Sequence, residues 1–198
     1  MVIIELNISQ TFWISADAHH YVVKFEGGGA IAELATIGQQ KAGAPVTYQD
    51  ATEKFTLTAT EGWIFDRTDA PGDSSYSVSF LDPDAIAMTG LEVKRLDKIP
   101  EEKRKSLRTW AEAEAQEAAG VYKDFKVRAD SWAERAVGGQ AAVSFIADYS
   151  TPKDKNVAYG IFMKSGSKGY IFETLLGAKD FENFKPQFDA IVDSYKTK

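Results

Sequence analysis

Apolar and polar residues alternate with a period of two along much of the chain, which is the pattern of half-buried strands. It is clearest in SYSVSFL, residues 75–81, where Tyr76, Val78 and Phe80 share one face and serines the other. The same reasoning predicts strands in the stretches 12–16, 19–26, 30–37, 53–59, 63–67, 85–96, 121–130, 131–137, 140–149, 156–164 and 169–176. Within 85–96, we expect Gly90 to mark a bulge or irregularity between two halves of the strand.

Helical spacing appears first in PEEKRKSLRTWAEAEAQEAAG, residues 100–120. Pro100 suits a first turn, the two following glutamates complement the positive end of a helix dipole, and Gly120 suits its end. Its apolar stripe consists of Leu107, Trp110, Ala111 and Ala118. The pattern therefore predicts a helix that begins at Pro100 and ends at Gly120.

A second amphipathic helix is predicted in DFENFKPQFDAIVDSYK, residues 180–196. Its apolar stripe consists of Phe181, Phe184, Phe188, Ile191, Val192 and Tyr195. Pro186 leaves two alternatives, because proline disfavours a helix interior but suits a first turn. Either the helix runs through it, or an initial turn precedes a helix that starts near Pro186.

This order of elements predicts an α+β fold, in which helices cover a mostly antiparallel β-sheet. Residues 12–37 form an additional N-terminal β-hairpin or three-stranded meander, and GQQKAGAPV, residues 38–46, is typical of a linker. We therefore expect a small N-terminal β segment with its linker over residues 1–45, and the main domain over residues 46–198.

The two histidines of the chain, His19 and His20, stand side by side in SADAHHYVVKFEGGG. Neighbouring side chains of a strand point to opposite faces, so only Asp17 and His19 would share one. Two ligands do not complete a metal site. With Gly27 and the glycines after it as a turn, the stretch is better explained as an ordinary hairpin, and we predict no metal and no cofactor.

Composition and charge narrow the classes of partner. A chain of 198 residues with 44% hydrophobic content can bury a core, and 23 basic against 29 acidic residues give a net charge of −6. This charge repels phosphate backbones, so we predict no nucleic-acid partner. No apolar run approaches the roughly 18 residues that a transmembrane segment needs. We expect an extracytoplasmic protein if the chain is a fragment of an exported precursor, and a cytoplasmic one otherwise.

Two stretches taken together resemble the PsbP-like family, which includes extrinsic photosystem II subunits, bacterial DcrB-type proteins and a Ran-binding nuclear import factor. YQDATEKFTLTATEGWIFDR, residues 48–67, is similar to the family's first hairpin. VAYGIFMKSGSKGYIFETLLGAKDFENFKPQFDAIVDSYK, residues 157–196, is similar to its last hairpin and C-terminal helix, with the Ser-aromatic pair Ser194 and Tyr195. The resemblance covers residues 48–198.

The resemblance implies an α/β/α sandwich around an antiparallel sheet, and mostly non-enzymatic work in binding or assembly. Many bacterial members are exported. Because similar folds serve unrelated functions, the resemblance fixes no partner. No residue by which members of the family contact their partners can be matched to this sequence.

Several patterns are similar to catalytic or binding motifs but lack the required context. Ser150 to Lys153 and Ser165 to Lys168 satisfy Ser-x-x-Lys, but that motif needs a helix and both lie in polar turns. Asp66, Asp69 and Asp73 fall in one Gly/Pro-rich stretch that predicts a loop, but they lack the ligand spacing of a calcium loop and are explained as solvated turn residues. The basic run Lys103, Arg104, Lys105 and Arg108 is explained by i,i+4 pairs of Glu101 with Lys105 and of Arg108 with Glu112.

Three hypotheses of function remain. The first is a non-enzymatic binding or assembly module whose partner is another protein or domain. The second is a carrier of a small apolar ligand between sheet and helix, in a candidate pocket lined by Trp110, Phe162 and Phe172. The third, ranked last, is a hydrolase or metalloenzyme at Asp17 and His19.

Overall fold

The computed structural model describes residues 2–6, 10–14, 22–27, 30–33, 43–69 and 75–197. The chain divides into two compact units, Met1–Ala42 and Gly43–Lys198. Each unit is considered by itself. The predicted division into residues 1–45 and 46–198 stays a prediction.

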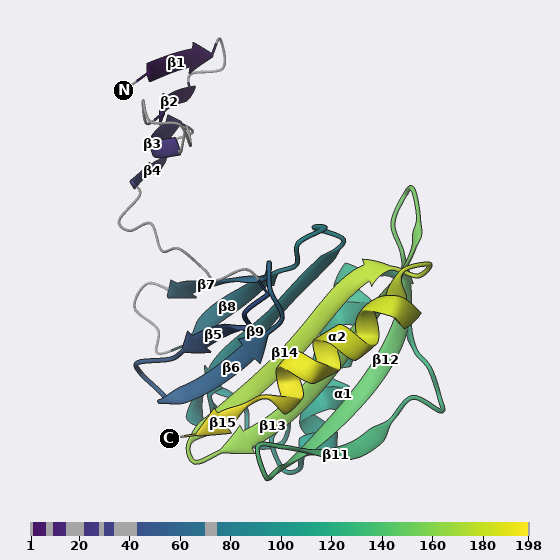
Figure 1. The fold of residues 1–198 in the computed structure, drawn as a ribbon. Coiled ribbons are helices and arrows are strands. Elements are labelled where there is room, and N and C mark those ends of the chain that lie inside the picture. The colour runs from purple at the N-terminus through teal and green to yellow at the C-terminus, as the bar shows by residue number, and fades with distance from the viewer. Residues whose placement is uncertain are drawn as a thin grey trace. The chain divides into compact units, whose positions relative to one another are not determined.

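The first unit is a four-stranded antiparallel sheet in the order β1-β2-β3-β4. Its strands are β1 (Val2–Leu6), β2 (Gln10–Ile14), β3 (Val22–Gly27) and β4 (Ala30–Glu33) (Figure 1). The sequence predicted three strands here, and β1 adds a fourth at the edge next to β2. Residues 15–21 and 28–29, which include both histidines, lie outside the described residues.

The second unit is built on a large antiparallel sheet with the strand order β10-β12-β13-β14-β9-β8-β7, and β11 also pairs with β12. Its strands are β7 (Ile64–Asp69), β8 (Tyr76–Leu81), β9 (Ala87–Arg95), β10 (Lys123–Val127), β11 (Ala133–Val137), β12 (Gln140–Ser150), β13 (Lys155–Ser165) and β14 (Lys168–Gly177). A smaller sheet contains β5 (Val46–Gln49), β6 (Phe55–Ala59) and β15 (Lys196–Thr197).

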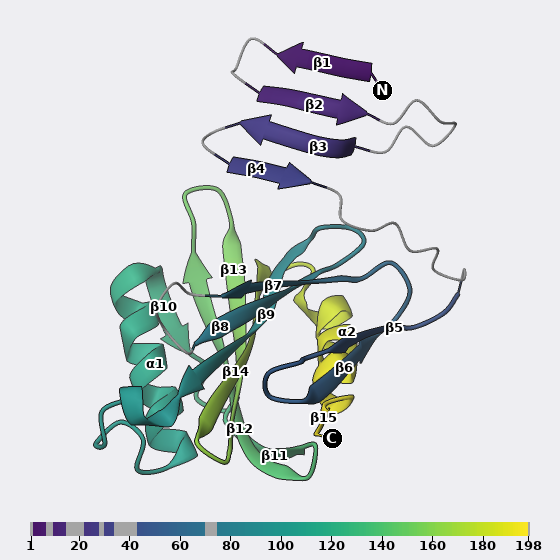
Figure 2. The same cartoon turned by 90° about the vertical axis from the view of Figure 1, so that its left-hand side faces the viewer.

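Two helices lie on opposite faces of the large sheet (Figure 2). α1 (Leu107–Val121) packs on β10, β12 and β13, whereas α2 (Phe181–Asp193) packs against β6 and β14. A short 3₁₀ helix, η1 (Leu96–Lys98), follows β9. Two apolar clusters fill the spaces on the two sides, one around Trp110 of α1 and one around Phe184 and Phe188 of α2. This arrangement confirms the predicted α+β fold with helices on both sides of an antiparallel sheet.

The first helix begins later than the sequence predicted. Residues 100–106 form turns, and α1 begins at Leu107 and runs through Gly120 to Val121. Ser106 is the N-cap, because its Oγ accepts a hydrogen bond of 2.9 Å from the backbone N–H of Thr109. The prediction placed the start at Pro100, but this serine, rather than the proline and glutamates before it, satisfies the free N–H groups of the first turn.

The second helix settles the alternative at Pro186. α2 starts at Phe181 and contains Pro186 in its interior. A helix that starts only near Pro186 is therefore wrong. The predicted apolar stripe is confirmed, because its residues are buried: Phe181, Phe184, Phe188, Ile191, Val192 and Tyr195. Burial of this stripe supplies the stability that offsets the backbone hydrogen bond which proline cannot make.

Gly90 does not mark a bulge. β9 keeps a continuous register with β14 and with β8 through this position, so the prediction of an irregularity is wrong. A Cβ atom at Gly90 would lie 2.9 Å from the carbonyl oxygen of Val78 on β8. Glycine is needed here because the neighbouring backbone approaches closely, which is the other common reason for glycine in a strand.

Candidate functional site

The face of the large sheet that carries α1 is only half covered by it. α1 lies over β10, β12 and β13, and the described residues place no helix over the same face of β7, β8 and β9. We call this uncovered half the open face. Three rows of residues make it up, and its members are Ile64, Leu81, Met88, Leu175, Asp66, Ser79, Gly90, Glu173, Thr68, Ser77, Glu92 and Ile171.

The first row of the open face is apolar. Ile64 of β7 pairs with Leu81 of β8, and Met88 of β9 pairs with Leu175 of β14. Three of these side chains are among the most exposed large apolar residues of the described chain: Ile64 is 59% exposed, Leu81 50% and Met88 75%. Single exposed apolar residues are ordinary, but a row that crosses neighbouring strands is typical of an interaction surface.

The second row is acidic at its two ends. Asp66 of β7 pairs with Ser79, Ser79 pairs with Gly90, and Gly90 pairs with Glu173 of β14. Because Gly90 has no side chain, the surface is recessed in the middle of this row. Within the described residues, neither carboxylate forms an ion pair with a cation.

The Glu173 carboxyl has an unusual environment. Solvent reaches its side chain, yet the surrounding strands and helix desolvate the carboxyl group, and this burial raises its pKa. The nearby carboxylates of Glu92 and Glu114 raise the pKa further, and the opposing effect of Lys94 is smaller. A cation beside Glu173 would therefore offset the cost of desolvating its carboxylate and the repulsion from Glu92 and Glu114.

One end of the open face is closed by a charged cluster. Lys94 Nζ lies 3.2 Å from a carboxylate oxygen of Glu92 and 3.2 Å from one of Glu114. Glu114 also accepts a hydrogen bond of 2.9 Å from the indole N–H of Trp110. These contacts join α1 to β9, so they fix the wall of the open face next to the helix.

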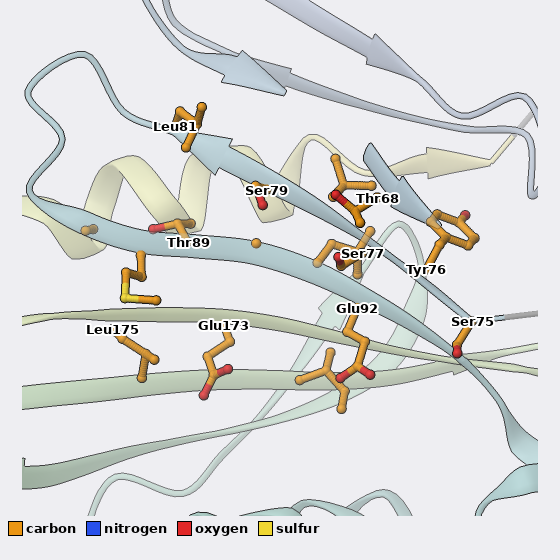
Figure 3. Close-up of a pocket in the computed structure, with 16 residues that line it drawn as sticks. Thr68, Ser75, Tyr76, Ser77, Ser79, Leu81, Thr89, Glu92, Glu173 and Leu175 are labelled. Atoms are coloured by element: carbon orange, nitrogen blue, oxygen red, sulfur yellow. The ribbon is translucent and has the colours of Figure 1, made fainter. Parts of the chain in front are cut away.

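The members of these rows on β8, β9 and β14, together with Thr68 of β7, line a hollow of about 650 Å³. Figure 3 shows Leu81, Glu92, Glu173 and Leu175 around it, contributed by β8, β9 and β14. The exposed apolar side chains lie in the first row and the serine hydroxyls in the second and third, so the surface can take both apolar contacts and hydrogen bonds. Among the described residues, no group of three His, Cys, Asp or Glu side chains could hold a metal ion. The arrangement is suited to binding a partner that carries apolar and basic side chains together.

The structure separates the three residues of the predicted apolar pocket. Trp110 and Phe162 contact each other edge to face, with ring centroids 5.5 Å apart, in the core under α1. Phe172 belongs to the core on the α2 side. The register explains the separation, because Phe162 pairs with Ile171 and the neighbouring Phe172 points to the other face of the sheet. The three side chains therefore do not line one common space.

Neither Ser-x-x-Lys stretch lies on a helix. Ser150 ends β12 and receives a hydrogen bond of 2.9 Å from Lys155, not from Lys153. Ser165 and Lys168 face each other as the pair that closes the β13–β14 hairpin, and Lys168 forms an ion pair of 3.0 Å with Glu53. These contacts give each residue a structural role in a turn.

The predicted acidic loop is partly a strand. Asp66 and Asp69 belong to β7, and Asp69 pairs with Arg67 at 2.7 Å. The loop assignment of these two residues is wrong, because β7 includes Asp66, as the strand predicted over residues 63–67 does, and continues as far as Asp69 in register with β8. Asp73 lies outside the described residues, as do Asp17 and His19 of the hydrolase hypothesis.

Two of the four cations in the basic run before and within α1 form ion pairs. Lys103 contacts Glu117 at 2.6 Å, and Arg108 contacts Glu112 at 2.7 Å in the predicted i,i+4 pair. Arg108 also lies over the ring of Trp132, 3.5 Å from its centroid. Glu101 and Lys105 precede the helix, so the i,i+4 spacing predicted for them does not apply.

The open face was not predicted from the sequence. Its signal is present, because Leu81 and Ile64 are apolar residues on faces that alternation otherwise assigns to polar side chains. The two residues are adjacent only across the β7–β8 pair. Their meaning therefore depended on the register and on which half of the sheet α1 covers.

Comparison with known proteins finds similarity in structure only. No family model matches the chain, and no curated protein matches it. The chain is similar to the solution structure of cyanobacterial PsbP (CyanoP) from Synechocystis sp. PCC 6803, with a TM-score of 0.55 and 13% identity over 83% of this chain and 99% of that one. The crystal structure of LpqN, described as involved in cell envelope biogenesis of Mycobacterium tuberculosis, has a TM-score of 0.49 and 13% identity over 79% of this chain and 85% of that one.

At this level of identity the likeness to CyanoP shows the fold. The chain has a PsbP-like fold, as the resemblance of its first hairpin, last hairpin and C-terminal helix predicted. Among the described residues, no helix has both the length and the apolar character to cross a membrane.

Proposed function

We propose that this protein is a non-enzymatic binding module whose partner is another protein, docked on the open face. The observation that carries the proposal is the exposed apolar row of Ile64, Leu81 and Met88, which lies next to two carboxylates that pair with no cation of the described chain. The PsbP-like fold supports the same direction, because the resemblance implies mostly non-enzymatic work in binding or assembly.

Charge indicates the chemistry of the partner. The ionisable side chains of the three rows are Asp66, Glu92 and Glu173, and among the described residues only Glu92 forms an ion pair, with Lys94. A surface with this sign attracts basic groups and repels acidic ones. The partner therefore presents apolar side chains to the first row and lysine or arginine to the second.

A second copy of this chain fits the open face less well. Two copies would place the same carboxylates against one another, and the whole chain carries a net charge of −6. Like charges brought together in an interface cost several kcal/mol by order of magnitude. We therefore assign the open face to a different protein with a basic segment.

The test is site-specific photo-crosslinking in cells of the source organism. A photoreactive amino acid replaces Met88 in one variant and Val121 in the other. Val121 is the matched control, because it is 78% exposed but lies at the end of α1, away from the open face. We expect a discrete protein adduct from position 88 and none of the same mass from position 121.

Two results would overturn the proposal. The first is the same set of adducts from both positions, which would indicate random collisions. The second is no protein adduct from position 88 in cells that contain normal amounts of the variant.

We also propose an extracytoplasmic location, which rests on the resemblance to a family with many exported members. Fractionation of source cells tests it. The full-length gene product should appear outside the cytoplasm, and recovery with cytoplasmic markers would contradict the proposal.

A further inference from the structure

β7 is an edge strand of the large sheet. In the described part of the chain it pairs with β8 alone, through six residue pairs from Ile64–Leu81 to Asp69–Tyr76. Figure 1 shows it at the margin of the sheet. The backbone N–H and C=O groups that point away from β8 have no partner strand among the described residues. Such an edge can template the addition of another strand.

β7 lacks most of the features that usually block an edge. Its register with β8 is continuous, so it has no bulge, and its sequence IFDRTD contains no proline or lysine. Only its charged side chains oppose strand addition. The Arg67 side chain is already engaged, because it forms ion pairs with Asp50 at 2.9 Å and with Asp69 at 2.7 Å.

Contacts on the other face hold β7 in place before any partner arrives. Phe65 packs against Tyr48 of β5 with ring centroids 5.7 Å apart. Arg67 reaches the buried carboxylate of Asp50 and lies 3.8 Å from the centroid of the Tyr76 ring. A strand that is already fixed in its bound conformation loses little conformational entropy on binding.

We propose that the partner of the open face docks by adding an extended segment to the free edge of β7. This inference rests on the proposed function and gives the mode of recognition. On the open-face side, the added strand places alternate side chains beside Ile64, Asp66 and Thr68. The segment therefore carries an apolar residue, a lysine or arginine, and a small polar residue at successive alternate positions. Its apolar residue extends the row of Ile64 and Leu81, and its cation lies beside Asp66.

The probe is a short β-forming peptide whose alternate side chains are valine, lysine and threonine. A first control peptide has glutamate in place of lysine, and a second has N-methylated amides, which cannot donate strand hydrogen bonds. Each peptide is titrated at millimolar concentration into the full chain labelled with ¹⁵N. The readouts are amide chemical shifts and the hydrogen-exchange rates of the β7 amides.

We expect the lysine peptide to slow exchange of β7 amides within Ile64–Asp69 and to shift resonances of β8, and the N-methylated peptide to do neither. Charge reversal sharpens the test. Asp66→Lys should weaken binding of the lysine peptide and strengthen binding of the glutamate peptide. We expect each affinity to change by about fivefold, which corresponds to a cross-strand pair worth ~1 kcal/mol. Glu134→Lys is the matched control, because Glu134 is exposed on β11 at the opposite side of the sheet and should change neither affinity.

The other outcomes overturn strand addition in distinguishable ways. If the lysine peptide shifts β9 and β14 without slowing exchange in β7, docking on the open face stands but its mode is wrong. If the peptide binds nowhere on the open face, strand addition is wrong, and the crosslink at position 88 decides the proposed function independently. If β7 is protected by self-association without peptide, the occupant is a second copy.

Discussion

Gly169 and Trp110 show how closely α1 and the sheet are fitted to each other. Trp110 is fully buried, and a Cβ atom built on Gly169 of β14 would overlap its indole ring. The indole therefore rests on bare backbone. Because protein interiors are packed without spare volume, even one methyl group has no place here.

Gly169→Ala should destabilise the protein by about 1–3 kcal/mol through overpacking, measured by urea unfolding. Gly120→Ala is the control, because Gly120 lies in α1 and the added Cβ would meet no atom within 4 Å other than those of its chain neighbours and its own helix backbone. The free energy of unfolding of that variant should rise by about 0.5–1 kcal/mol, because alanine has a higher helix propensity than glycine. Equal effects of the two substitutions would show that Trp110 does not pack on Gly169.

Asp50 is a buried carboxylate that organises the turn between β5 and β6. Burial alone would raise its pKa, but hydrogen bonds from the Glu53 backbone N–H and the Tyr48 hydroxyl, together with Arg67, lower the pKa below its ordinary value. Burial, together with a smaller effect of the same carboxylate, raises the pKa of Tyr48 to about 12. The carboxylate form thus holds the turn together.

A carboxyl with a lowered folded pKa stabilises the protein above its unfolded pKa, about 3.9, and loses that contribution as pH falls through the folded value. Asp50→Asn should therefore cost about 2 kcal/mol near neutral pH, where the natural residue is charged. The difference between the two proteins should shrink below about pH 4. Urea unfolding over a pH series measures it, and a cost that does not change with pH would contradict this account.

At the residue scale, sequence patterns identified burial well and contacts poorly. The alternation of Phe55, Leu57 and Ala59 predicted which side chains are buried, and all three are. It gave no sign that Asp50 pairs with Arg67, which is 17 positions away. Such pairs depend on how the small sheet packs against the large one. A period-two pattern carries no information about that packing.

The end of α2 shows how an element is joined to a distant strand. Ser194 Oγ accepts a hydrogen bond of 2.7 Å from the backbone N–H of Thr58 on β6, and it also lies 2.6 Å from the carbonyl oxygen of Ile191. The adjacent Tyr195 stacks on Phe55 with ring centroids 5.3 Å apart. The Ser-aromatic pair that carries part of the family resemblance therefore fastens the C-terminal helix to the first hairpin.

Ser194→Ala leaves the Thr58 N–H without its acceptor and should destabilise the protein by about 1–3 kcal/mol in urea unfolding. Ser79→Ala, on the open face, is the control and should change stability by less than about 0.5 kcal/mol. If Ser194→Ala left the stability unchanged, Tyr195 alone would hold the helix against the first hairpin.

At the element scale, most strands and both helices were predictable, but the start of α1 was not. Pro100, Glu101 and Glu102 have the composition of a helix start, and the N-cap signal of Ser106 lies six residues further on. Composition alone does not distinguish a helix that starts at Pro100 from one that starts after Ser106. The backbone N–H of Thr109 decides between them, because only Ser106 is placed to accept its hydrogen bond.

For the molecule as a whole, the two compact units lead to a prediction about folding. A fragment of residues 43–198 contains both helices, both sheets of the second unit and both apolar clusters. We expect it to unfold cooperatively, with the same slowly exchanging amides in β12, β13 and β14 as the full chain. Loss of cooperative unfolding in the fragment would show that residues 1–42 belong to the same folding unit.

The open face is the part of the molecule that sequence reasoning could not reach. Period two assigned the serines of β8 to one face and Tyr76, Val78 and Phe80 to the other. It could not show that Leu81, Met88 and Glu173, from three separate strands, form one surface there. That depends on the strand order and on the position of α1, which leaves β7, β8 and β9 uncovered.

The most direct test of the central claim is the yield of the position-88 crosslink in two charge-reversed backgrounds. Glu173→Lys changes the open face, whereas Glu134→Lys makes the same change of charge on β11. We predict that Glu173→Lys strongly reduces the adduct with the partner protein and that Glu134→Lys leaves its yield unchanged. An adduct with the same yield in both backgrounds would contradict the claim that the open face binds a basic partner.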